Sequence, residues 1–228
     1  MRGRLKEIVD KYMSAVNVSK YCTKCLDTRR WNGSVVLMVV DAAFTSVGLN
    51  YFTAVVPKVR EFRDRYVLNG EVSTLAKLAE AEEKLLSIWR NRRSVKAATQ
   101  IAKALLEFGG DDRAAIRNWA EKAKLEEWRS DAIGRIKGVG INTFQYLRMM
   151  GGVDTVMPDK IVKRVINGIL VRAGEEPVKG DIPFIRRVHE IAKLTGYRPI
   201  ELCWMTWLVE EKDGVIKAKK YISLLDEI

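Results

Sequence analysis

Cysteine and histidine are scarce in this chain of 228 residues, which has three cysteines and one histidine. So few cysteines do not make a disulfide framework, and they fit a reducing compartment. A zinc site normally needs four ligands. Cys22, Cys25, Cys203 and His189 would supply four, but only the first two are close in sequence. Zinc therefore stays an alternative that the spacing does not require.

Long apolar runs are also missing. The run from Val35 to Val40 is short, and Asp41 ends it, so no segment is long enough to cross a bilayer. The first residues, MRGRLKEIVDKYM, are charged and amphipathic and contain no apolar region of signal-peptide length. We therefore expect an intracellular, cytoplasmic protein with no membrane partner.

Acidic residues are outnumbered. Lys and Arg total 40 against 29 Asp and Glu, a formal net charge of +11, and 47% of the residues are hydrophobic. That hydrophobic fraction supports a folded core rather than a basic tail. A positive surplus on a folded domain favours a polyanionic partner, most commonly nucleic acid. A Lys/Glu-rich surface of the kind found in heat-stable proteins is the alternative.

Strand alternation is almost absent, whereas helical periodicity runs through nearly the whole chain. The sequence therefore predicts an all-α fold. Residues 20–33 are expected to be irregular, and Gly109-Gly110 ends one helix before a cap at Asp111 or Asp112. The expected helices cover residues 5–13, 34–45, 51–66, 71–90, 94–108, 112–125, 141–150, 160–173, 182–194, 199–211 and 216–225. The three stretches 71–90, 94–108 and 112–125 are expected to contain three or four helices.

The most informative stretch runs from Ile133 to Arg164. Helical residues lead into a turn at residues 136–140 (the glycine turn), which is too rich in glycine to be helix interior. A helix follows from Ile141 to Met150, then an extended crossing, and then a helix that opens on Asp159. Backbone N–H groups at the start of the second helix lack helical partners, and with the helix dipole they favour a bound anion.

These residues resemble a known motif. Lys137-Gly138-Val139-Gly140 with Thr143, followed by Val156-Met157-Pro158-Asp159, is similar to the helix-hairpin-helix and Gly/Pro-Asp motif of the DNA glycosylases. Asp159 lies 17 residues after Asn142, the family's spacing. The hairpin alone also occurs in non-enzymatic DNA-binding proteins, so the spaced Pro-Asp carries most of the specificity. An ordinary bundle in which Asp159 only caps a helix is the alternative.

The resemblance implies two all-helical lobes with a DNA-binding cleft between them. Residues 31–152 would form the central lobe, which ends in the helix-hairpin-helix. Residues 1–30 with 153–228 would form the second lobe, which carries Asp159. The implied partner is double-stranded DNA with a damaged or mismatched base, bound by a monomer. Relatives remove alkylated purines, deaminated pyrimidines or oxidised guanine, and the sequence favours none of them.

DNA binding is implied at several positions by the same resemblance. The glycine turn and the helix after it would hold a phosphate, and Lys137 replaces the family's usual proline. The loop at 46–50 occupies the place of the family's wedge, which fills the gap left by an extruded base; a plain turn between helices is the alternative. The implied DNA-binding residues are Lys137, Gly138, Gly140, Thr143, Lys160, Leu49 and Asn50.

Catalysis is implied at Asp159, which would stabilise positive charge on the sugar as the base leaves and orient the attacking water. Tyr146 and Trp207 are the candidates for contacts with the extruded base. Relatives that also cut the strand use a lysine at the position of Asn142. An amide cannot form the imine, so the resemblance implies a monofunctional enzyme. The alternatives are a strand-cleaving enzyme that uses another lysine, and a non-catalytic binding module.

Cofactors are expected to play no catalytic part. In similar proteins the hairpin's carbonyl groups hold a sodium or potassium ion, and by position these belong to Gly134, Ile136 and Val139. The family's iron–sulfur loop needs four closely spaced cysteines near the C-terminus, where this chain has Cys203 alone. A cluster of Arg90, Arg92, Arg93 and Lys96 marks either a further phosphate contact or a solvated face.

Overall fold

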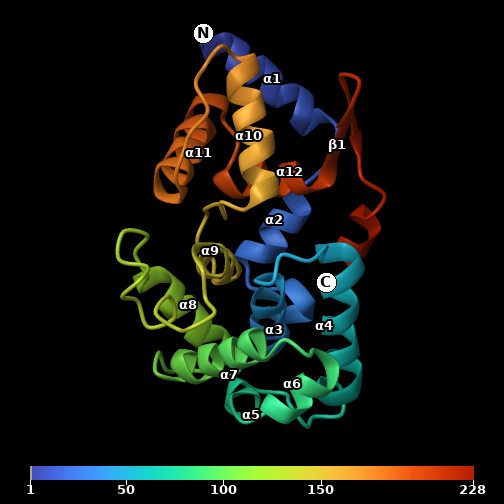
Figure 1. Ribbon diagram of the computed structural model, residues 1–228, viewed down its shortest axis with the longest axis vertical. Helices are drawn as coiled ribbons and strands as arrows, with labels where there is room; N and C mark the ends of the chain where they lie inside the picture. The colour runs from blue at the N-terminus through green and yellow to red at the C-terminus, as the bar shows by residue number, and fades with distance from the viewer. Residues whose placement is uncertain (1) are drawn as a thin grey trace. The chain divides into compact units, whose positions relative to one another are not determined.

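The computed structural model describes residues 2–228, and most of them are helical (Figure 1). The prediction of a mainly helical protein is confirmed. The chain divides into two compact units, one of residues 25–153 with 228 (the central unit) and one of residues 2–24 with 154–227 (the terminal unit). The sequence placed these divisions after residues 30 and 152.

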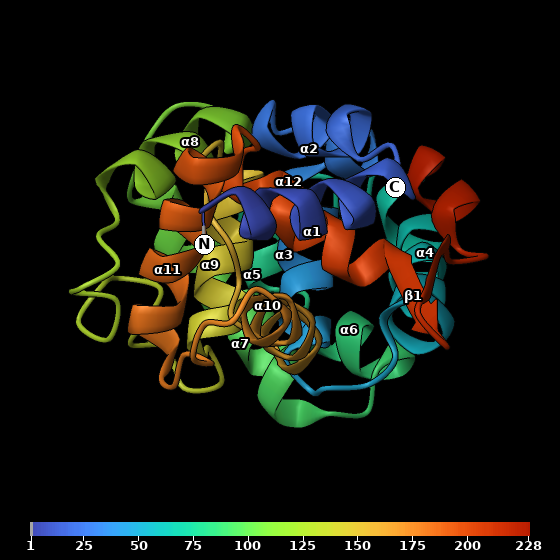
Figure 2. The same cartoon turned by 90° about the horizontal axis from the view of Figure 1, so that it is seen from above.

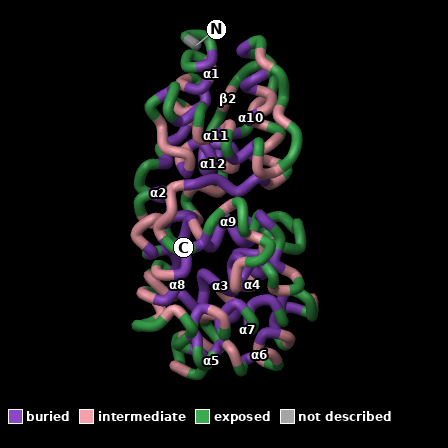
Figure 3. Tube along the Cα trace, turned by 90° about the vertical axis from the view of Figure 1, so that its left-hand side faces the viewer, coloured by how far each residue is buried: buried purple, intermediate pink, exposed green. Residues whose placement is uncertain are grey.

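The central unit is built around α3 (Val35–Thr45), a helix that is buried over all but its last residue (Figure 3). Ser34 caps this helix by accepting a hydrogen bond from the N–H of Leu37 at 3.3 Å. α7 (Arg92–Leu106) and α9 (Ile141–Met150) both pack against it. The other elements of the unit are η1 (Arg30–Gly33), η2 (Tyr51–Val55), α4 (Val56–Phe62), η3 (Arg63–Val67), α5 (Leu75–Ala79), α6 (Glu82–Ile88) and α8 (Asp112–Lys122).

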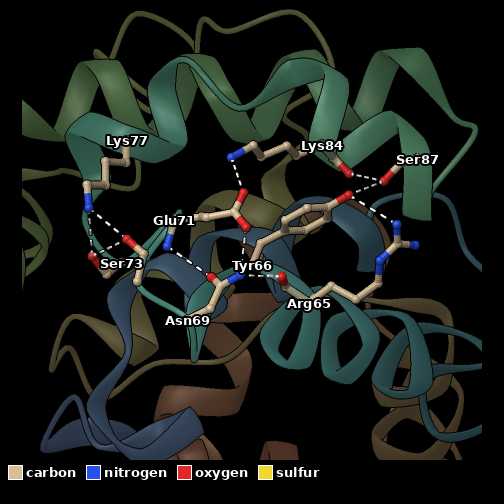
Figure 4. A network of polar contacts seen from close by, with 9 residues as sticks. Arg65, Tyr66, Asn69, Glu71, Ser73, Lys77, Lys84 and Ser87 are labelled. Atoms are coloured by element: carbon tan, nitrogen blue, oxygen red, sulfur yellow. Dashed lines mark hydrogen bonds and ion pairs between the residues drawn. The ribbon is translucent and has the colours of Figure 1, made fainter.

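A polar network fixes the turn that follows η3 (Figure 4). The ring of Tyr66 lies 5.2 Å from the guanidinium of Arg65 and 5.5 Å from the amine of Lys84. Its hydroxyl is 2.9 Å from Oγ of Ser87 on α6. Lys84 also pairs with Glu71, at 2.5 Å. These contacts join η3 to α6 on the surface of the central unit, where each exposed ion pair adds little by itself.

The terminal unit contains α1 (Arg2–Ser14), α10 (Lys160–Arg172), α11 (Asp181–Thr195) and α12 (Pro199–Leu208). α1 packs against the other three helices (Figure 2). α12 continues into a hairpin of β1 (Val209–Lys212) and β2 (Val215–Ala218), and η4 (Ile222–Asp226) ends the unit. α2 (Ser19–Leu26) runs across the division at residues 24 and 25.

Two expected elements are wrong. Residues 20–33, expected to be irregular, contain most of α2. Residues 71–90 form two short helices, α5 and α6, which with α7 and α8 give four helices where three or four were expected. The helix expected at 216–225 is β2 followed by η4. The strand forms here because Asp213 and Gly214 make a two-residue β-hairpin turn, with φ angles of 52° and 78°.

Candidate functional site

A helical segment was expected before the glycine turn, but residues 125–138 form successive turns and no helix. Oδ1 of Asp131 accepts hydrogen bonds from the N–H groups of Ile133 and Gly134, at 2.8 and 3.3 Å. It also accepts one from the indole of Trp119, at 3.0 Å. The N–H of Arg135 donates to the carbonyl of Asp131 at 3.1 Å. Asp131 thus orders the approach to the glycine turn through its side chain, whereas a helix would order it through backbone hydrogen bonds.

The two glycines of the turn serve different purposes. Gly138 has a φ of +108°, and a Cβ there would lie 3.2 Å from Cγ and from the carbonyl oxygen of Arg93. Both observations require glycine for the fold. A Cβ at Gly140 would meet nothing within 4 Å. Gly140 therefore leaves open space in front of α9, as expected of a backbone that another molecule approaches closely.

The start of α9 matches the predicted position, with Gly140 as N-cap and Ile141 as the first helical residue. No side chain caps this helix, whereas Ser34 and Asp111 cap α3 and α8. The first N–H groups of a helix have no partners within it, so those of α9 are free of helical and side-chain partners. Asn142 is exposed, and Thr143 is buried.

The predicted cation ligands lie in the same turn. The carbonyl of Ile136 accepts a hydrogen bond from the N–H of Val139 at 2.9 Å, which leaves one of its lone pairs for an ion. Within residues 2–228, no group of three or more His, Cys, Asp or Glu side chains could hold a metal ion. Cys22, Cys25 and Cys203 are buried thiols.

The structure brings the basic cluster at the start of α7 to the glycine turn. Arg93 lies directly against Gly138. Ala97, one turn further along α7, also lies against it: a Cβ on Gly138 would be 3.3 Å from Cβ of Ala97. Lys137, the residue before Gly138, is exposed. In the sequence these two regions are far apart, and the central unit makes them neighbours. The cluster's four cations, Arg90, Arg92, Arg93 and Lys96, are all exposed.

The predicted wedge lies in an exposed loop between α3 and η2. Leu49 exposes 53% of its surface and Val47 exposes 36%. Asn50 caps η2, because its side-chain oxygen accepts a hydrogen bond from the N–H of Thr53 at 3.1 Å. Leu49 is thus exposed beside a capped helix start. Leu68, in the same unit, exposes more of its surface, 72%, so exposure alone does not single out Leu49.

Tyr146 belongs to a buried polar cluster that sequence reasoning missed. Oδ2 of Asp41 on α3 accepts hydrogen bonds from the indole of Trp31 at 2.8 Å, and from the hydroxyls of Tyr51 and Tyr146 at 3.0 Å each. The guanidinium of Arg30 pairs with the same oxygen at 3.2 Å. Burial raises the pKa of Tyr146 well above 10.0, which keeps its hydroxyl protonated as a donor. The sequence contained one sign of this cluster: Asp41 is the single acid in the apolar run VVLMVVDAAF.

Asp159 caps α10 in the terminal unit, as predicted. Its Oδ1 accepts hydrogen bonds from the N–H groups of Ile161 at 2.6 Å and Val162 at 2.9 Å. Its Oδ2 is buried and has no donor in regular hydrogen-bond geometry among the described residues. One oxygen suffices for the cap, so the second is left for another role.

The environment of Asp159 favours a proton. Burial raises the pKa of its carboxyl above the ordinary 3.8, and this outweighs the lowering by the N–H groups of Val162 and Ile161. The indole of Trp207 on α12 is near enough to lower the same pKa, although its geometry falls short of a regular hydrogen bond. The predicted catalytic residue and one predicted base-contact residue are therefore neighbours.

The extended crossing that precedes Asp159 is tied to two helices of the same unit. Oδ1 of Asp154 accepts a hydrogen bond from the N–H of Ile200, in the first turn of α12, at 3.0 Å. The hydroxyl of Thr155 is 3.2 Å from Nε2 of His189 on α11. These contacts fix the chain just before Asp159, so the carboxyl lies on a rigid support. Lys160, the next residue, is exposed.

Lys219 is a second residue near Asp159 that sequence reasoning missed. Its backbone N–H donates to the carbonyl of Leu208 at 2.8 Å, which brings it next to the end of α12. Burial lowers the pKa of its amine, and nearby Arg164 lowers it further, while Glu210 and Asp159 act to raise it. No sequence signal identified it, because the β-hairpin that returns it to α12 was not predicted.

The predicted residues fall into two sets. The central unit holds the glycine turn, Asn142, Tyr146 and the exposed loop with Leu49, and the terminal unit holds Asp159, Lys160 and Trp207. Within residues 2–228, none of the helices has both the length and the hydropathy of a membrane span.

Comparison with known proteins gave one match. A family model, described as a domain of unknown function (DUF8548), matches residues 7–211. That range includes both sets of predicted residues. No curated protein and no solved structure matches the chain.

Proposed function

The chain belongs to the family described as a domain of unknown function (DUF8548), and we propose that it is a DNA glycosylase of base excision repair. It would extrude a damaged or mismatched base from duplex DNA and hydrolyse the N-glycosidic bond, leaving an abasic site. An enzyme that acts on a base must take it out of the stack, at a cost of a few kcal/mol.

The observation that carries the proposal is the carboxyl of Asp159. A carboxylate whose only task is to cap a helix needs no burial, and burial makes its charge costly. Here burial raises the pKa of Asp159, and Oδ2 is not used by the cap. Perturbed carboxyls of this kind are typical of functional sites. A protein that only binds DNA would gain nothing from a buried carboxyl that faced this polyanion.

Asp159 would have two roles: it would stabilise positive charge on the sugar and accept a proton from the attacking water. Positive charge builds on the sugar as the base departs, and a fixed carboxylate beside C1′ stabilises it. Water then attacks C1′ and loses a proton to the carboxylate, while the base leaves with the bonding electrons and is protonated. Trp207 beside Asp159 would contact the extruded base. Tyr146 is the second candidate for that contact.

The central unit would bind the DNA backbone without reading its sequence. Uncapped N–H groups at the start of α9, open space at Gly140 and the exposed Lys137 support a phosphate site at the glycine turn. Lys160, in the terminal unit, would add a contact near Asp159. Leu49 and Asn50 would fill the gap left by the extruded base. An apolar side chain exposed on a loop suits this role, because such wedges insert between base steps.

We place this enzyme in the cytoplasm as a monomer on double-stranded DNA, without a catalytic cofactor. A sodium or potassium ion on the carbonyls of Gly134, Ile136 and Val139 would strengthen the phosphate site by its charge. The second lone pair of the Ile136 carbonyl is compatible with such an ion.

A second candidate activity is strand cleavage by Lys219. A lysine amine attacks C1′ of the opened abasic sugar, loses water to form an imine, and then promotes elimination of the 3′ phosphate. The lowered pKa of Lys219 and its position near Asp159 favour this alternative. Position 142, which carries the lysine in strand-cleaving relatives, is asparagine here, so we retain the monofunctional enzyme as the main proposal.

A base-release screen tests the proposal. Purified protein is incubated with duplexes that each carry one lesion or mismatch, and released bases are measured. The proposal requires release from at least one class of duplex. Binding to duplex DNA with no release from any class would favour the non-catalytic module instead.

A further inference from the structure

Two stretches of the central unit contain no acidic residue. No Asp or Glu occurs at residues 84–106 or at residues 132–153. All 29 acidic residues of the chain lie outside these two stretches, where they are interspersed with basic residues. The two stretches therefore differ from the rest of the chain in carrying positive charge alone. The first covers all of α7 and the second covers the glycine turn and α9.

These two stretches meet in the folded unit. The glycine turn packs against the first turns of α7, where Gly138 lies against Arg93 and Ala97. Two segments without acids are thereby joined into one region of positive charge. Six exposed cations belong to it, and we call them the basic surface: Arg90, Arg92, Arg93, Lys96, Arg135 and Lys137.

Within the described residues, none of the six side chains of the basic surface makes a hydrogen bond or ion pair. Other cations of the same unit do make such pairs. Lys58 and Arg65, for example, both pair with Glu61, at 2.8 and 3.4 Å. Unneutralised cations gathered on one surface repel one another, and an external polyanion relieves that repulsion.

We propose that the basic surface binds the phosphodiester backbone over several phosphates, with the glycine turn as one contact and the start of α7 as the next. The cations are long, flexible side chains on a helix start and a tight turn, which suit phosphates better than base edges. Binding should therefore be independent of base sequence and strongly dependent on salt. The inference rests on the proposed function for its choice of duplex DNA.

The test measures duplex binding by fluorescence anisotropy over a range of salt concentrations. Arg92→Gln with Lys96→Gln removes two charges from the basic surface without touching Gly138. Lys58→Gln with Arg65→Gln is the control, because it removes one lysine and one arginine from the same unit, both of which are ion-paired with Glu61. For each phosphate that the protein no longer neutralises, the slope of log K against log salt becomes shallower by about 0.9.

We expect the slope to become shallower by about 1.8 in the first double variant and to stay at the wild-type value in the control. Equal slopes in the two double variants would overturn the proposal that the basic surface binds phosphates. If base release by the wild type persists in that case, the proposed function stands without this extension. If the wild type neither binds duplex nor releases any base, both fail. Circular dichroism and thermal unfolding establish that the two double variants are equally folded.

Discussion

At the scale of single residues, the two glycines of the turn should respond differently to the same small change. Gly138→Ala places a side chain at a φ of +108° and against Arg93. Left-handed conformations cost non-glycine residues about 1–2 kcal/mol. We expect a decrease of roughly that size in unfolding free energy by urea denaturation, and almost none for Gly140→Ala. Equal decreases would contradict the geometry of the turn.

The stability of the protein should depend on the protonation of Asp159. Its folded-state pKa is raised above 3.8, so the folded state holds this proton more tightly than the unfolded chain does. The resulting stabilisation is present below the unfolded pKa and disappears as pH rises through the folded pKa. Asparagine keeps the cap and carries no charge.

Asp159→Asn should therefore be more stable than the wild type at neutral pH. The difference should shrink as pH falls toward 3.8. Urea denaturation of both proteins across this range measures it. If the wild type has the larger unfolding free energy at neutral pH, the charged carboxylate does not destabilise the folded state.

At the scale of elements, helix starts were predictable because they depend on local residues. α9 and α10 begin where the sequence placed them, since a glycine turn and Asp159 mark their first residues. Features set by distant contacts were not predictable. Asp41 is hydrogen-bonded to Tyr146, 105 residues away. Lys219 reaches the neighbourhood of Asp159 only through a β-hairpin, whose Asp-Gly turn was hidden among residues with helical periodicity.

The glycine turn with α9 is the element that should bind phosphate. Gly140→Leu fills the open space in front of α9 and leaves the fold intact, because a Cβ there meets nothing within 4 Å. Duplex affinity should fall to a similar degree for damaged and undamaged DNA, as measured by anisotropy. A decrease confined to one sequence or one lesion would contradict a backbone contact.

The start of α9 also tests the choice between water and lysine as nucleophile. With Asn142 at the key position, the wild type should give no efficient covalent adduct with abasic DNA under borohydride. Asn142→Lys, at an exposed position, should form one. An efficient adduct with the wild type that is absent in Lys219→Gln would instead establish strand cleavage through Lys219.

At the scale of the whole molecule, we assign separate tasks to the two units. The central unit has the uncapped start of α9, the six cations of the basic surface and the exposed Leu49, and the terminal unit has the perturbed carboxyl of Asp159 with an indole beside it. The net charge of +11 is consistent with a polyanionic partner. Binding and catalysis should therefore be separable by substitution, since the basic surface belongs to the central unit and Asp159 to the terminal unit.

The most direct test of the central claim is base release by Asp159→Asn on a duplex that the wild type cleaves, measured in a single turnover. Asp154→Asn is the matched control, because Asp154 is an acid of the same crossing that holds the start of α12. We predict that Asp159→Asn binds duplex at least as tightly as the wild type and is slower by roughly a hundredfold or more, while Asp154→Asn keeps most of its activity. Release by Asp159→Asn at the wild-type rate would contradict the catalytic role of this carboxyl.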